Sequence, residues 1–261
     1  GLFAAAAFYA GNFTIAKLVM PAYVQPYGFI VLRVVAAAAL FWLTQWAMRT
    51  GERIQSGDWA RLWLCALTGV AANQLLFFKG LSYTTPIHGA LIMLMTPMLV
   101  LIAATVLLRE RLSWQKIVGV GIGLAGASLL VVGAGSNTVA NAPNPVLGDL
   151  LVGANAISYS FYLILVKPLM HRYNPITVLK WVFTLGVVMV VPVGSADLLA
   201  VDWANMPTNT YIAIAYVLFC VTYLTYLFNT SALRVVSPSV VSAYIYLQPL
   251  LTAVIALFTR Q

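Results

Sequence analysis

The sequence has little charge of either sign. Only 8% of its 261 residues are Asp, Glu, Lys or Arg, whereas 62% are hydrophobic and the mean hydropathy is +0.93. A soluble domain is about 25% charged, so this composition excludes an ordinary water-soluble fold. The apolar runs continue for about 20 residues, as a transmembrane helix requires, and they lack the alternation of membrane-barrel strands. We therefore expect an all-α polytopic membrane protein.

Acidic residues are especially scarce. The sequence has six Asp and Glu residues, and all of them lie in loops or at the ends of apolar runs. An ionisable residue inside a membrane span commonly marks a proton or ion pathway. Because no carboxylate lies within a run, we do not expect ion coupling through one. Facilitated, gradient-driven exchange or export is the simpler expectation.

Cysteine and histidine are also rare, and this restricts the chemistry. Cys65 and Cys220 both lie in apolar runs and read as small buried hydrophobes rather than a disulfide framework. With two histidines and no acid inside a run, the sequence offers no nucleophile–base pair, carboxylate pair or metal cluster. We predict that the protein is not an enzyme, and that it uses no metal.

Nine apolar runs are long enough to cross a bilayer. They occupy residues 1–19, 27–48, 59–80, 86–108, 114–133, 149–169, 175–194, 209–230 and 238–259. The longest loop, GAGSNTVANAPNPVLGD, is rich in Pro, Gly and Asn, which do not continue a helix. We therefore expect five helices in residues 1–133, a periplasmic linker at 134–148 and four helices in residues 149–261.

The two halves resemble each other in sequence. Pro86 and Pro97 correspond to Pro238 and Pro249 at one common offset. Because the first half has an odd number of spans, the second half enters the membrane from the opposite side. This predicts inverted-topology repeats, an architecture of secondary transporters. Gln261 aligns with Arg109, so we expect the fifth helix of the second repeat, the tenth overall, to be missing from this sequence.

Basic residues predict the orientation. With a cytoplasmic N-terminus, the inner loops carry nine basic residues, whereas the outer ends carry Lys17 and Arg260, with Lys79 a little inside. The nine are Arg49, Arg53, Arg61, Arg109, Arg111, Lys116, Lys167, Arg172 and Arg234. The positive-inside rule therefore favours a multi-pass protein of the bacterial inner membrane with its N-terminus in the cytoplasm. The net charge of +8 then needs no nucleic-acid partner.

The segment RERLSWQKIVGVGIGLAGASLLV, which follows a proline-broken span, carries a family resemblance. The matching residues are Pro97, Glu110, Arg111, Leu112, Gln115, Gly119, Gly123 and Gly126, together with the later run Gly148-Asp149-Leu150-Leu151. This pattern resembles the EamA-type transporters of the drug/metabolite transporter superfamily. The resemblance covers both halves and implies ten helices, no cofactor, and movement of small metabolites across the membrane. Members of similar length export amino acids, and others carry nucleotide-like compounds or drugs.

Neutral polar residues near the middle of the runs are the main candidates for substrate binding. They are Tyr9, Asn12, Asn73, Gln74, Asn155, Tyr159, Tyr162, Tyr223, Tyr226, Tyr244 and Gln248. Hydroxyl and amide groups would bind a zwitterion, and ring faces would contact its side chain. The alternative is that some of them only bridge neighbouring helices, since such hydrogen bonds average about 0.6 kcal/mol. We expect about half of them to face a cavity between the halves.

Charged and titratable residues inside the runs are few. Lys79 and His88, near the outer ends of their spans, are further candidates for substrate contact, against headgroup contact or helix-end hydrogen bonding. For Arg33 and Lys180 we expect side chains that reach back toward the membrane surface.

Pro97 and Pro249 each remove a backbone hydrogen bond and predict bent helices. We expect a hinge there, with a static kink as the alternative. Gly119 and Gly123 form a Gly-xxx-Gly step that indicates close helix packing, and a homodimer face is left open.

Taken together, these features predict an inner-membrane secondary carrier that exports amino acids or related zwitterions by alternating access. A multidrug or nucleotide-like carrier, a channel and a membrane sensor are the alternatives. The expected partners are a small-molecule substrate and the lipid bilayer.

Overall fold

The computed structural model describes residues 1–16, 19–20, 23–49, 51–133 and 143–259, and the part of the chain it describes contains helices and no strands. Lys17, Arg260, Gln261 and most of the predicted linker lie outside these residues. The α-helices are α1 (Leu2–Ala16), α2 (Pro26–Met48), α3 (Trp59–Ala66), α4 (Ala72–Tyr83), α5 (Pro86–Met93), α6 (Thr96–Leu107), α7 (Trp114–Gly133), α8 (Pro145–Val166), α9 (Pro175–Leu199), α10 (Thr208–Tyr216), α11 (Thr225–Ala232), α12 (Pro238–Ala243) and α13 (Leu247–Thr259).

Six helical stretches in the described residues are long and apolar enough to cross a membrane. They are Pro26–Met48, Ser56–Tyr83, His88–Leu107, Pro145–His171, Pro175–Leu199 and Thr208–Ala232. The other three predicted spans contain α1, α7, and α12 with α13. The polytopic helical membrane fold is thus confirmed. The count of nine spans, the tenth helix and the division into two five-helix repeats stay predictions.

Proline marks where many of these helices begin. Helices α2, α5, α8, α9 and α12 each have Pro at a first helical position. Proline suits this position because its fixed φ matches the helix and its missing N–H would have no partner there. Side chains cap three of the same starts, with Thr85 accepting from the His88 N–H, Asn144 from Leu147 and Asn174 from Ile176. The loop prolines seen in the sequence therefore set the helix boundaries.

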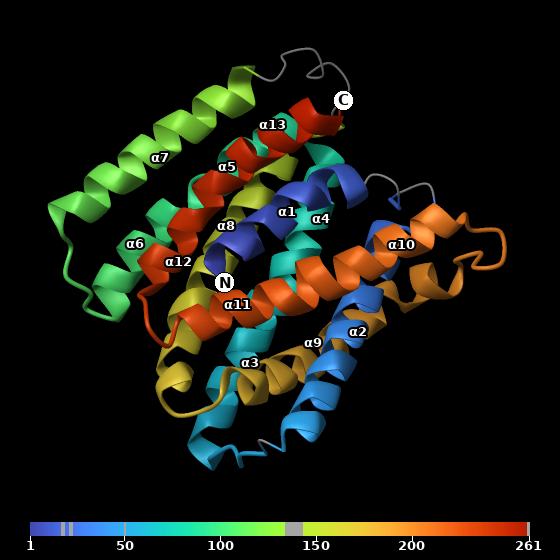
Figure 1. Cartoon of the computed structure of the whole chain (residues 1–261), viewed down its shortest axis with the longest axis horizontal. Coiled ribbons are helices and arrows are strands. Elements are labelled where there is room, and N and C mark those ends of the chain that lie inside the picture. Colours follow the sequence, from blue (N-terminus) through green and yellow to red (C-terminus); the bar gives the residue numbers. More distant parts are fainter. Residues whose placement is uncertain (17–18, 21–22, 50, 134–142, 260–261) are drawn as a thin grey trace.

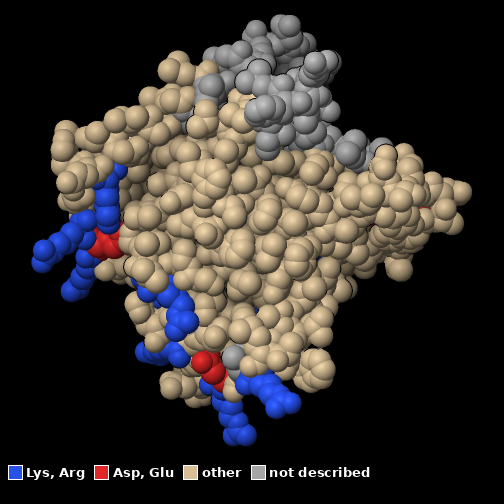
Figure 2. Space-filling model, in the orientation of Figure 1, with Lys and Arg blue, Asp and Glu red and all other residues tan. Residues whose placement is uncertain are grey.

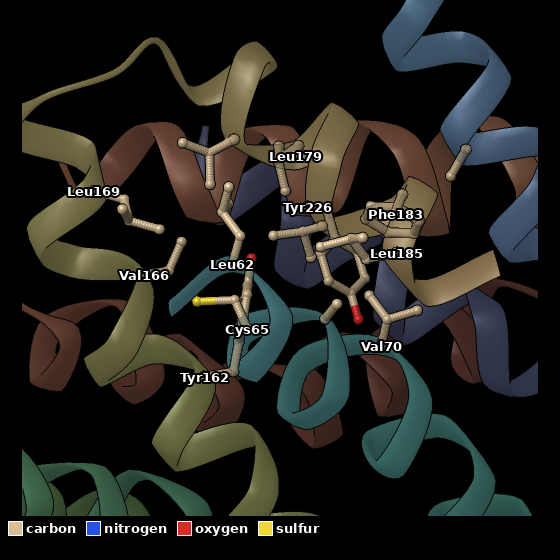
Figure 3. Close-up of a cluster of buried hydrophobic side chains, with 14 of the residues drawn as sticks. Leu62, Cys65, Val70, Tyr162, Val166, Leu169, Leu179, Phe183, Leu185 and Tyr226 are labelled. Atoms are coloured by element: carbon tan, nitrogen blue, oxygen red, sulfur yellow. The ribbon is translucent and has the colours of Figure 1, made fainter. Parts of the chain in front are cut away.

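The core lies where helices from the two halves of the chain meet. Helix α2 packs along α9, and α4 packs along α8. Figure 1 shows α2 and α9 on one side of the molecule and α7 at the opposite edge. The buried side chains of this core include Leu62, Val70, Tyr162, Phe183 and Tyr226, which point into one cluster in Figure 3.

Corresponding helices of the two halves are interrupted at corresponding places. A π-helical segment, η2 (Leu67–Ala71), separates α3 from α4, and a second one, η5 (Val217–Leu224), separates α10 from α11. The helices carrying Pro97 and Pro249 are also broken, between α5 and α6 and at the 3-10 turn η6 (Tyr244–Tyr246). Each break lies just before its proline, where the missing N–H leaves a backbone carbonyl unpaired.

Charge is distributed along one border of the molecule. In Figure 2 the visible Lys and Arg side chains gather along the lower and left edge, with a few acidic residues among them. The rest of that face shows little charge, as expected for a surface in contact with lipid. This distribution accords with the predicted orientation, which stays a prediction.

Candidate functional site

Four of the predicted tyrosines come together between α1, α8 and α11. The ring centroids of Tyr159 and Tyr162 are 5.9 Å apart, and those of Tyr162 and Tyr226 are 6.2 Å apart. The Tyr9 hydroxyl is close enough to the hydroxyls of Tyr159, Tyr162 and Tyr226 to interact electrostatically with each of them. We call Tyr9, Tyr159, Tyr162 and Tyr226 the tyrosine cluster. It brings together residues from the N-terminal and the C-terminal halves of the chain.

The π-helical segment η2 fits closely against this cluster. The Tyr226 hydroxyl donates to the Gly69 carbonyl over 2.7 Å. The Tyr162 ring lies so close to Gly69 that a Cβ atom there would clash with it. The Tyr162 hydroxyl pairs with Thr230 at 3.1 Å. These contacts hold two of the four rings in place, and these two rings form one wall of the cluster.

A buried cation, Arg33, lies beside this wall. Arg33 on α2 is only 7% exposed, and its Nε donates to the Thr222 hydroxyl over 3.0 Å. Its guanidinium is close enough to the hydroxyls of Tyr9 and Tyr226 to interact electrostatically with both. Its side chain therefore lies among helices, and the expectation that it reaches the membrane surface is wrong. Its distance from the helix end could not reveal this, because that distance does not say which face of the helix the residue occupies.

Unpaired amide groups form the second part of the site. Asn155 Nδ2 donates to the backbone carbonyl of Asn73. Within the described residues, Asn155 Oδ1, both polar atoms of the Gln74 side chain and Asn12 Oδ1 are buried without a hydrogen-bond partner. A buried polar atom left unpaired costs about 1–3 kcal/mol, so such groups usually pair with water or ligand. These amide atoms are therefore candidates for contact with water or a ligand.

Other predicted residues have partners or positions elsewhere. Tyr223 packs its ring 4.7 Å from that of Phe41, and its hydroxyl pairs with Thr44 at 2.7 Å. This arrangement matches the alternative of a helix–helix bridge. Lys79 is exposed, with its Nζ 4.8 Å from the centre of the Tyr83 ring.

The two candidates near the C-terminus have different surroundings. Tyr244 lines a surface hollow of about 510 Å³ together with Leu2 and Phe228. Gln248 is half-buried on α13, and its carbonyl accepts from the Thr252 hydroxyl. That hydroxyl also approaches the carbonyl of Ala10, next to Tyr9 in the chain. Gln248 is thus one helical turn from a contact with the helix that carries Tyr9.

Lys180 is the second buried basic residue. It is 6% exposed, and its Nζ lies 4.1 Å from the Trp42 ring centre and 4.6 Å from that of Trp181. Aromatic faces attract a cation at such distances. The Lys180 ammonium therefore lies against two tryptophan rings, and its expected reach toward the membrane surface stays a prediction.

Polar contacts close the molecule at the predicted outer side. The Thr84 hydroxyl donates to Asp149 over 2.5 Å, and His88 Nδ1 lies 3.2 Å from the other Asp149 oxygen. These contacts join the start of α5 to the start of α8. His88 therefore serves as a contact between helix ends in this structure.

The predicted inner side has two comparable groups of contacts. Arg172 and Tyr173 both donate to the Asp58 carboxylate, at 3.0 and 2.8 Å. Burial, together with that carboxylate, raises the pKa of the Tyr173 hydroxyl, which therefore keeps the proton it donates. The Glu110 carboxylate accepts from Lys116 over 2.8 Å and from Ser239 over 3.0 Å. These contacts link the turns of the first half to those of the second.

Comparisons with known proteins agree with this architecture. A model of the EamA-like transporter family matches residues 1–132 and 146–260. The chain is 27% identical over 190 residues to the uncharacterized transporter YyaM of Bacillus subtilis, a match that covers 73% of this chain and 62% of that protein. It is 25% identical to an uncharacterized transporter of Archaeoglobus fulgidus, covering 96% of this chain and 84% of that one.

Two further comparisons concern a named export activity and the fold. A probable terminal-alkyne amino-acid exporter of Streptantibioticus cattleyicolor is 27% identical over 141 residues, covering 54% of this chain and 46% of that exporter. One protein crystal structure superposes with a TM-score of 0.79 at 17% identity, covering 99% of this chain and 86% of that one. This last similarity concerns the fold alone.

Proposed function

The chain belongs to the EamA-like transporter family, and from that premise we propose that it is a secondary carrier that exports amino acids or related small zwitterions by alternating access. Membership places it among membrane transporters and not among enzymes. The substrate, the direction and the mechanism are our proposal.

The observation that supports this function best is the tyrosine cluster with its unpaired amides. Aromatic rings offer apolar faces and hydroxyl edges, and they would receive the side chain of an amino acid. The unpaired oxygens of Asn12, Gln74 and Asn155 would accept hydrogen bonds from an ammonium group. The similarity to a protein named as a probable amino-acid exporter supports the same class of substrate.

The broken helices support alternating access. Discontinuous helices near the membrane midplane are the usual place of substrate sites in carriers with inverted repeats. Here the breaks before Pro97 and Pro249 and the segments η2 and η5 occur in corresponding helices of the two halves. Rocking of the halves about these breaks would open the site to one side and then to the other.

Counterflow in proteoliposomes tests the carrier proposal. We expect liposomes with the full-length protein, preloaded with an unlabelled amino acid, to take up the labelled one saturably. Tyr159→Ala, Asn155→Ala and Gln248→Ala should each reduce uptake. We expect a reduction of about tenfold where the side chain loses a hydrogen bond to the substrate. Tyr23→Ala, at an exposed position outside the cluster, is the control. Uptake that rises linearly without saturation would indicate a channel instead.

A further inference from the structure

Arg33 is a buried cation without an acidic partner. The described residues form three ion pairs, between His88 and Asp149, Lys116 and Glu110, and Arg172 and Asp58. None of them includes Arg33. The other acidic residues of the sequence lie in loops or at helix ends. The guanidinium on α2 is therefore placed inside the helical bundle without a carboxylate to balance it.

Such a placement is costly unless something compensates for it. A buried charge needs an opposite charge or several hydrogen bonds to offset the loss of water. Arginine also remains protonated in proteins, so it cannot avoid the cost by losing its proton. Within the described part of the chain, the Arg33 side chain makes one hydrogen bond, to the Thr222 hydroxyl. A guanidinium has five N–H donors, so most of them are free for a ligand.

The neighbours of Arg33 indicate where that ligand lies. Its guanidinium interacts electrostatically with the hydroxyls of Tyr9 and Tyr226, which both belong to the tyrosine cluster. Asn12, whose Oδ1 is buried and unpaired, follows Tyr9 by one helical turn on α1. A cation, two tyrosines and an unpaired amide oxygen thus come from α1, α2 and α11. Together they offer donors for an anion and an acceptor for a cation.

We propose that Arg33 binds the carboxylate of the transported substrate, at the edge of the tyrosine cluster. The fork of a guanidinium matches the two oxygens of a carboxylate, and an arriving carboxylate would supply the missing counter-charge. This inference rests on the proposed carrier function and names the chemical group that the site requires. It predicts that an amino acid is a much better substrate than its amide or its decarboxylated amine.

The test compares L-phenylalanine with L-phenylalaninamide and phenethylamine in the counterflow assay, using full-length protein. We expect the wild-type protein to prefer the acid by roughly 10- to 100-fold, the value of a hydrogen-bonded charge. Arg33→Gln, which keeps a donor for Thr222, should abolish that preference, and Arg33→Lys should retain part of it. Lys180→Gln removes the other buried cation and should leave the preference unchanged.

A binding measurement separates failure of this inference from failure of the carrier proposal. The solubilised protein is titrated with the twenty L-amino acids and their amides, and its tryptophan fluorescence is followed. If the protein binds acids but not amides, and Arg33→Gln loses this binding, the role of Arg33 is supported even without flux. The absence of flux would then refute only the carrier proposal. Equal transport of acid and amide by the wild type, binding of neither, or an unchanged preference in Arg33→Gln would overturn the role of Arg33.

Discussion

At the scale of single residues, Gly69 shows how closely the site is packed. Its carbonyl accepts from the Tyr226 hydroxyl, and the Tyr162 ring occupies the place of its missing side chain. A residue with a Cβ atom would push that ring out of the tyrosine cluster. Because Gly69 has no side chain, two tyrosines from α8 and α11 can pack against η2.

Gly69→Ala should therefore destabilise the protein, in contrast to most glycine-to-alanine changes in helices. Overpacking a core commonly costs about 1–3 kcal/mol. Gly153→Ala is the matched control, because a Cβ at Gly153 on α8 meets open space, and alanine favours the helix by up to about 1 kcal/mol. Thermal unfolding in detergent measures both. Equal midpoints for the two variants would contradict this view of the Tyr162 contact.

The residues of the site were only partly predictable. The repeat and the polar residues within apolar runs identified all four members of the tyrosine cluster. The surroundings of Arg33 were predicted wrongly, and Tyr223 bridges two helices instead of joining the cluster. The reason is that sequence position gives depth in the membrane but not the helix face. Contacts such as that between Arg33 and Thr222 join residues far apart in the chain. They depend on how α2 crosses η5, which no local pattern encodes.

At the scale of helices, the spans were easier to predict from the sequence than the breaks within them. The spans follow from apolar length, and the prolines at helix starts make their boundaries visible in the sequence. The break before Pro97 was predicted as well, since proline cannot donate to the residue one turn earlier. The segments η2 and η5 were not predicted. Leu67–Ala71 contains no proline, and π turns are rare and have no simple sequence signal.

The break before Pro97 should act as a hinge, and Pro97→Ala tests it. Alanine restores the N–H that could bond to the Met93 carbonyl, and it would stiffen the joint between α5 and α6. We expect the maximal transport rate to fall several-fold while substrate binding changes little. Pro192→Ala is the control, because Pro192 lies inside the continuous helix α9. A static kink would predict unchanged transport in both variants.

At the scale of the whole molecule, the two sides are held together differently. One side joins the starts of α5 and α8 through Asp149, whereas the other uses Asp58 and Glu110 with their basic partners. A carrier that alternates its access must break one of these groups of contacts in each state. The structure has both groups formed. If the protein alternates its access as proposed, each group contributes to the barrier between states, and a ligand that favours one open state must offset the contacts on that side.

The orientation of the whole molecule leads to the last prediction. Helices α2 and α9 pack antiparallel, because Gly28 near the start of α2 lies against Asp197 and Leu198 near the end of α9. The loop after α2 and the loop after α9 therefore lie on opposite sides of the membrane if each helix crosses it once. The first loop carries Arg49 and Arg53, and the positive-inside rule places it in the cytoplasm. Single cysteines at Ser56 and Ala204, both exposed, should therefore differ in accessibility.

Labelling with a membrane-impermeant maleimide measures this in a background where Cys65 and Cys220 are replaced by Ser. We expect Ala204→Cys to react in intact cells, and Ser56→Cys to react only in inverted vesicles. The cysteine-free protein is the control for background labelling. The opposite pattern would place the N-terminus outside and the Asp58 contacts on the outer surface. Labelling of both positions from one side would mean that α2 and α9 do not each cross the membrane once.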